Sequence, residues 1–282
     1  MSEQRVIRVG LVQMAMDPDA QVNRDRAVAL VAEAAGQGAQ VICLPELFTT
    51  PYFPVVRDAK SPGETIPGPT SRLLAETARK HGVVLVGGSI YERDGDRFYN
   101  TALIFDDRGE LVGKYRKIHI PQDECFFEKD YFTPGDLGYL VTKTRFGSIG
   151  VLICYDQWYP EAARMNALLG ANMVFYPTAI GTVAHLGEKE GPWQEAWENV
   201  QRGHAIANGM VVAAANRVGI EGDTTFWGGS FICDAFGQTK IRAGAEEGVI
   251  VQDVDLDHGE VVREGWGFLR NRRPDSYNQI TE

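Results

Sequence analysis

SIGVLICYDQWYPEAAR, residues 148–164, is the stretch of sequence that decides the fold. Its first part is apolar and β-branched and predicts a buried strand over Ser148–Cys154, and its second part predicts a helix from about Pro160 to Leu169. A strand that leads directly into a helix is typical of layered α/β proteins. Cys154 would then lie at the carboxyl end of a strand, which is the edge of a sheet where α/β proteins bind their ligands.

The rest of the 282-residue chain repeats this alternation of strand and helix patterns. Continuous apolar runs predict strands that are buried on both faces, and a hairpin is expected at Asp106–Gly109. Because no repeat or linker divides the chain, we expect a single α/β domain over residues 1–282. The other expected strands are Val6–Met14, Val41–Leu44, Val83–Ile90, Thr101–Phe105, Leu111–Lys117, Met173–Tyr176, Met210–Ala215, Ser230–Cys233 and Gly248–Asp253, and the other expected helices are Gln21–Gly36, Thr70–Lys80 (capped by Thr70 or Ser71) and Trp193–Ala207.

The composition restricts the partners and the compartment. The chain has 28 basic and 38 acidic residues, a net charge of −10, which argues against nucleic acid and anionic membranes because phosphate binding needs clustered cations. The four cysteines form no CxxC pair, which favours reduced thiols. No signal-peptide pattern and no run approaching the roughly 20 apolar residues of a membrane span are found, so we expect a cytoplasmic protein.

Three chemically useful side chains follow three of the expected strands. Glu46 follows VICLP, Lys117 ends LVGKYRK and Cys154 ends SIGVLIC. Each has an ordinary explanation taken alone: a cysteine packs as a small hydrophobic residue, a glutamate caps or faces solvent, and a lysine protects a strand edge. Glu128, in FFEKDYFTPGD, would by default be a loop charge. The combination is more informative than any one member.

Together these residues suffice for acyl transfer without a metal or cofactor. Glu46 could accept the proton of the Cys154 thiol and later pass it to a leaving amine. Lys117 and the backbone N–H of Tyr155 could stabilise the oxyanion, and Glu128 could orient Lys117 or the attacking water. We find no zinc-ligand spacing, Walker loop or GxGxxG, so no metal and no cofactor are expected. A Cys–His pair remains open, since five histidines could approach in space: His81, His119, His185, His204 and His258.

The chain resembles the nitrilase superfamily of carbon–nitrogen hydrolases over nearly its whole length. The resemblance lies in LPELF around Glu46, GKYRKIHIP around Lys117, VLICYDQWYPEAAR around Cys154, and EKDYFTPGD, which begins at Glu128. It implies a four-layer α-β-β-α sandwich, a Glu–Lys–Cys triad with Glu128 as a second glutamate, and a thioester acyl-enzyme. It also implies at least a homodimer, and the aromatic and arginine-bearing tail from about Trp266 is expected to pack at the subunit interface.

Within this superfamily the chain resembles the N-carbamoylputrescine amidases, through FYPTAIG and GWGFLRNRRPDSY among other stretches. The resemblance implies release of ammonia, carbon dioxide and putrescine. The segment Gln122–Phe127 lacks the Gly/Pro-rich sequence of the plant enzymes, and the Gly181–Pro192 loop also differs. The only cation of that loop is Lys189, among acidic neighbours, which favours an amine-bearing substrate. The expected substrate-binding residues are Tyr52, Tyr155, Trp158, Tyr159, Thr178 and Glu188, with Glu190 and Glu195 as further partners for an amine.

Two other functions remain open at this point. The same triad could serve an aliphatic amide, a nitrile or an N-carbamoyl amino acid, whose carboxylate would need a cation that a neighbouring subunit could supply. A function of another class, an inactive scaffold or binding subunit, is disfavoured because a scaffold needs neither the thiol nor its two charged neighbours. The aromatic side chains near the motifs could equally be ordinary core residues.

Overall fold

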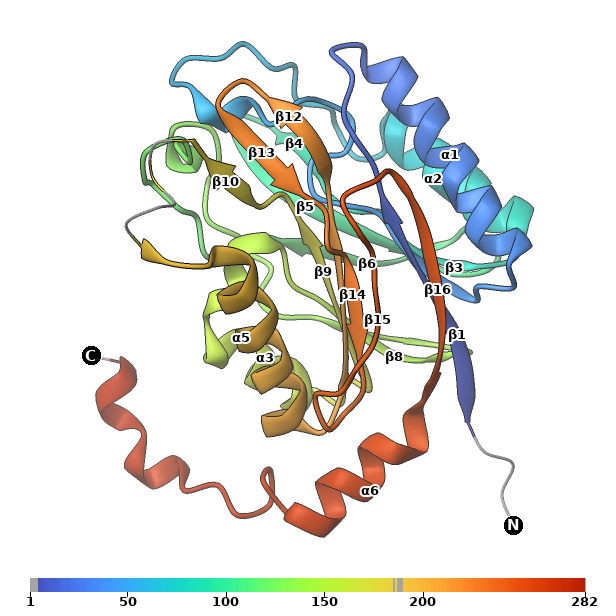
Figure 1. Cartoon of the computed structure of the whole chain (residues 1–282), viewed down its shortest axis with the longest axis vertical. Helices are drawn as coiled ribbons and strands as arrows, with labels where there is room; N and C mark the ends of the chain where they lie inside the picture. Colours follow the sequence, from blue (N-terminus) through green and yellow to red (C-terminus); the bar gives the residue numbers. More distant parts are fainter. Residues whose placement is uncertain (1–4, 185, 187–189, 282) are drawn as a thin grey trace.

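The structure, a computed structural model, describes residues 5–184, 186 and 190–281 and contains two large sheets (Figure 1). The strands of the first sheet are β1 (Val6–Gln13), β2 (Val41–Cys43), β3 (Val84–Val86), β4 (Ile90–Asp94), β5 (Arg97–Phe105), β6 (Leu111–Arg116) and β16 (Gly248–Asp255). Those of the second are β7 (Val141–Thr144), β8 (Gly147–Val151), β9 (Met173–Thr178), β11 (Val211–Asn216), β14 (Phe231–Cys233) and β15 (Thr239–Arg242). A small third sheet has the order β10 (Gly181–Val183), β13 (Thr224–Trp227), β12 (Val218–Glu221).

The sheets pack face to face between two layers of helices. Helices α1 (Ala20–Gly36) and α2 (Pro69–His81) cover the outer face of the first sheet, and α3 (Pro160–Leu168) and α5 (Trp193–Asn208) cover that of the second (Figure 1). The layer order α-β-β-α confirms the four-layer sandwich that the sequence predicted. No helix in the described ranges is long and apolar enough to cross a membrane.

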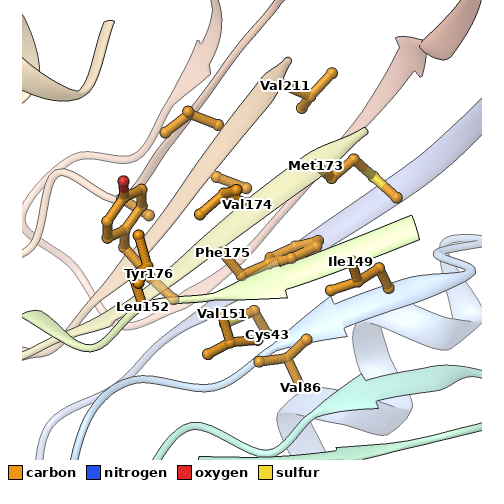
Figure 2. Close-up of a cluster of buried hydrophobic side chains, with 14 of the residues drawn as sticks. Cys43, Val86, Ile149, Val151, Leu152, Met173, Val174, Phe175, Tyr176 and Val211 are labelled. Carbon is orange, nitrogen blue, oxygen red and sulfur yellow. The ribbon is translucent and has the colours of Figure 1, made fainter. Parts of the chain in front are cut away.

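Strand β2 contributes side chains to two hydrophobic cores, one between the sheets and one beneath α1 and α2. Its neighbours β1 and β3 both run parallel to it, and all its residues are buried. Because successive side chains of a strand point to opposite faces, Val41 and Cys43 join the core between the sheets, whereas Ile42 packs beneath α1 and α2. In Figure 2, Cys43 and Val86 of the first sheet face Val151 of the second.

Several predicted boundaries were wrong for local physical reasons. The cap of α2 is Gly68, whose N–H donates to the Ser71 hydroxyl at 2.8 Å, and neither Thr70 nor Ser71 occupies the cap position. The expected strand Val83–Ile90 is two strands, because the chain turns between β3 and β4 at Gly88, whose φ is +60°. The expected strand to Cys154 ends at Val151, since a 3₁₀ turn, Cys154–Trp158, begins at the thiol.

The sequence also failed to predict helix α6 (Leu256–Trp266). Two glycines, Gly259 and Gly265, weaken its helix propensity. The signal that could have located it is Asp255, whose side chain accepts hydrogen bonds from the N–H groups of Asp257 and His258. Beyond α6 the tail contains two short 3₁₀ turns, Pro274–Ser276 and Asn278–Thr281.

Gly88 fixes the backbone beside Glu46. A Cβ added there would lie 2.2 Å from the carbonyl oxygen of Pro45. We expect Gly88→Ala to lower the free energy of unfolding by about 3 kcal/mol, which combines the cost of positive φ with displacement of the Pro45–Glu46 backbone. Urea denaturation measures this loss.

Gly95→Ala is the matched control, because Gly95 also has a φ of +60° but nothing lies within 4 Å of its added Cβ. We expect that variant to lose about 1 kcal/mol, from the backbone conformation alone. Equal losses in the two variants would show that the contact with Pro45 does not constrain the fold.

Candidate active site

Glu46 lies just beyond β2 and is fully buried. Its Oε1 accepts hydrogen bonds from Lys117 Nζ at 2.9 Å and from Asn100 Nδ2 at 2.8 Å. Its Oε2 has no hydrogen-bond partner among the described residues. A buried carboxylate oxygen without a partner costs free energy, and it keeps its capacity to accept a proton.

Lys117 follows β6, and its ammonium lies between two carboxylates. Nζ is 2.9 Å from Glu46 Oε1 and 2.8 and 2.7 Å from the two oxygens of Glu128. Burial alone would lower the pKa of Lys117, but the charges of Glu128 and Glu46 outweigh it and raise that pKa above its ordinary value. Lys117 therefore remains a cation, suited to stabilise a developing negative charge rather than to act as a base.

Glu128 begins a 3₁₀ turn, Glu128–Asp130, and is also fully buried. Burial raises the pKa of Glu128 to about 7, against the opposing charge of Lys117. The hydroxyl of Tyr52 donates to Glu128 Oε1 at 2.6 Å. Glu128 is therefore held from two sides, by Lys117 and by Tyr52.

Cys154 starts the turn that connects β8 to α3, with a left-handed backbone conformation (φ 42°) that is uncommon outside glycine. Its thiol is directed toward the carbonyl oxygen of Ala179, 3.9 Å away. Burial, and then the negative charge of Glu46, raise the pKa of the Cys154 thiol well above its usual range. The resting group is therefore a thiol that needs a base to become nucleophilic.

Asp156 holds the turn that carries Cys154. Its Oδ2 accepts hydrogen bonds from the Ile153 N–H at 2.9 Å and the Tyr115 hydroxyl at 2.7 Å. Its Oδ1 accepts the N–H of His119 at 3.0 Å and lies 2.7 Å from that residue's Nδ1. Asp156 thus connects the Cys154 turn to the segment that follows Lys117. The sequence analysis missed this role, although a lone carboxylate within an apolar stretch could have indicated it.

A cavity of about 590 Å³ opens beside Cys154 and Glu128, whereas Glu46 and Lys117 lie behind its lining residues. Asp123, Glu124 and Glu190 contribute carboxylates, and no lysine or arginine of the described chain belongs to its lining. An ammonium group would therefore be favoured over a carboxylate in the described part of the cavity. The full lining is Tyr52, Pro121, Asp123, Glu124, Phe126, Glu128, Cys154, Tyr155, Gln157, Trp158, Ala179, Ile180, Leu186, Glu190, Trp193 and Ala196.

Not every expected substrate-binding residue faces this cavity. Tyr52, Tyr155 and Trp158 line it, but Tyr159 and Thr178 do not. The ring of Tyr159 instead stacks on His119 at a centroid distance of 3.7 Å, and the buried Thr178 hydroxyl donates to the Tyr176 carbonyl at 2.9 Å. Glu188 lies outside the described residues.

The residues of the cavity wall that the sequence analysis missed come from loops and from α5. They include Phe126 and Trp193, which belong to none of the motifs that carry the family resemblance, and Pro121 and Ile180, which lie within GKYRKIHIP and FYPTAIG but were not expected to bind the substrate. The Cys–His alternative gains no support, because no described histidine hydrogen-bonds to Cys154 or lines the cavity. Within the described ranges, no group of three or more His, Cys, Asp and Glu side chains could hold a metal ion.

Three known proteins are similar to this chain over nearly its whole length. The N-carbamoylputrescine amidase of Solanum lycopersicum is 39% identical, with 98% of this chain and 95% of that protein covered. The citrullinase of Francisella tularensis is 37% identical, with 97% and 98% covered. The omega-amidase of Danio rerio is 37% identical, with 96% of each covered.

Two solved structures that are similar to this chain belong to the same family. A carbon–nitrogen hydrolase from Helicobacter pylori G27 has a TM-score of 0.92 and 38% identity, covering 98% of this chain and 99% of that one. A mutant of the Nesterenkonia sp. AN1 amidase, in which the acetamide moiety of fluoroacetamide is bound covalently to the active-site cysteine, has a TM-score of 0.82 and 29% identity over 99% of this chain and 98% of that one.

The sequence model of the carbon-nitrogen hydrolase family matches residues 8–264. Because this match and the relatives above extend over nearly the whole chain, the chain belongs to the carbon–nitrogen hydrolases of the nitrilase superfamily, cysteine-dependent enzymes that cleave non-peptide C–N bonds.

Proposed function

We propose that this protein hydrolyses N-carbamoylputrescine to putrescine, carbon dioxide and ammonia. The main observation behind the proposal is a cavity that is lined by Cys154 and whose described wall bears carboxylates and no lysine or arginine. N-carbamoylputrescine has a ureido group at one end and an ammonium at the other, which suits this distribution of charge. The similarity to the Solanum lycopersicum amidase supports the same substrate.

The proposed first half-reaction forms a thioester. Glu46 Oε2 takes the thiol proton while the Cys154 sulfur attacks the ureido carbon. Lys117 and the N–H of Tyr155 stabilise the oxygen that becomes negative. The C–N bond to the terminal NH₂ then breaks, Glu46 returns the proton to that nitrogen, and ammonia leaves.

The second half-reaction consumes one water. Glu46 removes a proton from the water as its oxygen attacks the thioester carbon, and the sulfur of Cys154 departs and regains a proton. The product is an N-substituted carbamic acid, which breaks down to putrescine and carbon dioxide. Glu128 keeps Lys117 oriented through both half-reactions by its two hydrogen bonds of 2.8 and 2.7 Å.

Recognition of the substrate tail would come from the acidic wall. Asp123, Glu124 and Glu190 can attract the ammonium, and the rings of Trp158 and Trp193 can pack along the four methylene groups or contact the cation. The apolar chain of a diamine needs such a surface between its two polar ends.

Citrulline is the second candidate, because the Francisella tularensis citrullinase is 37% identical. Citrulline carries the same ureido group but adds a carboxylate beside its amine. A buried carboxylate needs a cationic partner, and none lines the described part of the cavity. The observed charges therefore favour the simple amine, although the triad would serve either substrate, an aliphatic amide or a nitrile.

We further propose that the chain is one domain that assembles into at least a homodimer. Exposed apolar side chains gather on α3, on α5 and on the tail, which borders a groove along both helices. Such a surface is unusual for a monomer and fits a second copy. The side chains are Met165, Leu168, Leu169, Ile206, Trp266 and Phe268.

We expect light scattering at micromolar concentration to give at least twice the chain mass, and a monomer mass would contradict the proposal.

The substrate is tested by measuring ammonia release from N-carbamoylputrescine, citrulline, N-carbamoyl-β-alanine, propionamide and an aliphatic nitrile. We expect kcat/KM for N-carbamoylputrescine to exceed the others by at least about 100-fold, since its ammonium pairs with the acidic wall and it has no carboxylate to bury, a difference of about 3 kcal/mol. Cys154→Ala is the blank. A preference for citrulline would overturn the substrate but not the triad, and ammonia release by Cys154→Ala would overturn the mechanism.

The role of the acidic wall is tested by Glu190→Gln. We expect this variant to raise KM for N-carbamoylputrescine about fivefold, since one partly solvated ion pair contributes about 1 kcal/mol, and to leave KM for propionamide unchanged. Glu195→Gln is the matched control, because Glu195 is exposed in the first turn of α5, five residues after Glu190, but does not line the cavity. An equal effect of both substitutions would show that only the general charge of this surface matters.

A further inference from the structure

Arg217 is a fully buried arginine that no step of the reaction above uses. It lies between β11 and β12 and reaches the turn that runs from Glu46 to Tyr52. Its Nη2 donates to the carbonyl oxygens of Glu46 at 2.8 Å and of Leu47 at 3.1 Å. The guanidinium thus binds the backbone of the residue whose side chain is the expected general base.

Glu221, at the end of β12, completes this arrangement. Its Oε1 accepts from Arg217 Nη1 at 2.8 Å, and its Oε2 accepts from the backbone N–H of Tyr52 at 2.6 Å. Arg217 and Glu221 therefore hold the two ends of the same turn. The turn would be costly without support, since Leu47 within it has a φ of 46°.

The two ends of this turn carry two contacts of the triad. The Glu46 side chain accepts from Lys117, and the Tyr52 hydroxyl donates to Glu128, which is the other carboxylate beside Lys117. A shift of the turn would therefore displace both carboxylates relative to Lys117. It would also change the distance between Glu46 Oε2 and the Cys154 thiol.

The contacts at this position suit an arginine better than a lysine. A planar guanidinium can donate to two successive carbonyls and a carboxylate at the same time, which a lysine ammonium cannot do with the same geometry. The rings of Phe226 and Tyr52 lie 5.2 and 5.8 Å from the guanidinium carbon and enclose it. Burying this cation costs desolvation free energy, so packing alone does not account for an arginine that contacts the Glu46 turn.

Arg217 is also connected to the other side of the site. Its N–H donates to Asn216 Oδ1 at 2.9 Å, and the same oxygen accepts the N–H of Ile180 at 3.0 Å. Ile180 lines the cavity next to Ala179, whose carbonyl contacts the thiol. The pair Asn216-Arg217 thus links the backbone beside the base to the backbone beside the nucleophile.

We propose that Arg217, paired with Glu221, is a positioning residue that sets the distance between the general base Glu46 and the Cys154 thiol. The inference rests on the triad of the proposed function but not on the identity of the substrate. Arg217 touches no reacting atom, and its effect on the rate passes through the Glu46–Tyr52 turn.

The test compares Arg217→Met, Arg217→Lys and Glu221→Gln with the wild-type enzyme, using whichever substrate that enzyme hydrolyses best. Arg263→Met is the control, because Arg263, although only partly buried, likewise donates to two backbone carbonyls, those of Asn208 and Ala171, away from the site. Circular dichroism and urea denaturation give the folded fraction, and every rate is expressed per folded molecule. Alkylation of Cys154 by iodoacetamide, followed by peptide mass spectrometry across pH, reports on the base without any substrate.

We expect Arg217→Met to lower kcat about 100-fold, the order of loss that a misplaced base produces, with KM changed less than about threefold. Glu221→Gln should lower kcat about tenfold, because the carbonyl contacts of Arg217 remain. Arg217→Lys should recover only part of the loss. In Arg217→Met the alkylation of Cys154 should be slower and should rise at higher pH than in the wild type, whereas Arg263→Met should change neither kcat nor the alkylation profile.

If Arg217→Met loses stability but keeps kcat and the alkylation profile of the wild type, Arg217 is structural only and the proposal is wrong. The same conclusion follows if Arg263→Met lowers kcat per folded molecule as much as Arg217→Met does. Failure of the proposed substrate has a different signature: the wild type would hydrolyse another compound, while the alkylation profiles would still separate the variants.

Discussion

A fully buried ammonium held between two fully buried carboxylates is the interaction on which this structure depends. Removing Lys117, Glu46 and Glu128 from water costs several kcal/mol of desolvation free energy for each ion. The attraction between the ions offsets this cost only when their geometry is good and further hydrogen bonds are made. Those bonds come from Asn100 to Glu46 and from Tyr52 to Glu128. One oxygen, Glu46 Oε2, is left without a partner among the described residues, and that is the oxygen to which the proposed reaction assigns the proton transfers.

The packing of the two sheets determines the chemistry. Glu46 and Lys117 follow strands of the first sheet, whereas Cys154 follows a strand of the second. The proposed base and the proposed nucleophile therefore come from different sheets, whose inner faces pack together (Figure 2). Asp156 binds the segment after Lys117, and Arg217, which we propose as a positioning residue, binds the Glu46 turn. The same packing excludes water from the ion cluster and strengthens its electrostatics.

Apolar periodicity predicted a layered α/β protein and the strands that precede Glu46, Lys117 and Cys154, because such patterns depend on local order in the chain. The four-layer sandwich was predicted only from the resemblance to the nitrilase superfamily. It did not predict contacts that depend on tertiary packing. Nothing in the local sequence indicates that the Tyr159 ring stacks on His119 rather than facing the cavity, or that Arg217 reaches a turn about 170 residues away. Helix α6 was missed because its glycines weaken a pattern whose only clear signal is the Asp255 cap.

Trapping the acyl-enzyme tests the central claim most directly. Wild-type protein would be mixed with N-carbamoylputrescine, quenched in acid within the first turnover and digested for peptide mass spectrometry. We predict an acyl adduct of the substrate on the peptide that contains Cys154, absent from Cys43, Cys125 and Cys233 and lost in a Glu46→Gln variant. Turnover without an adduct on Cys154, or an adduct on another cysteine that disappears as product forms, would contradict the account.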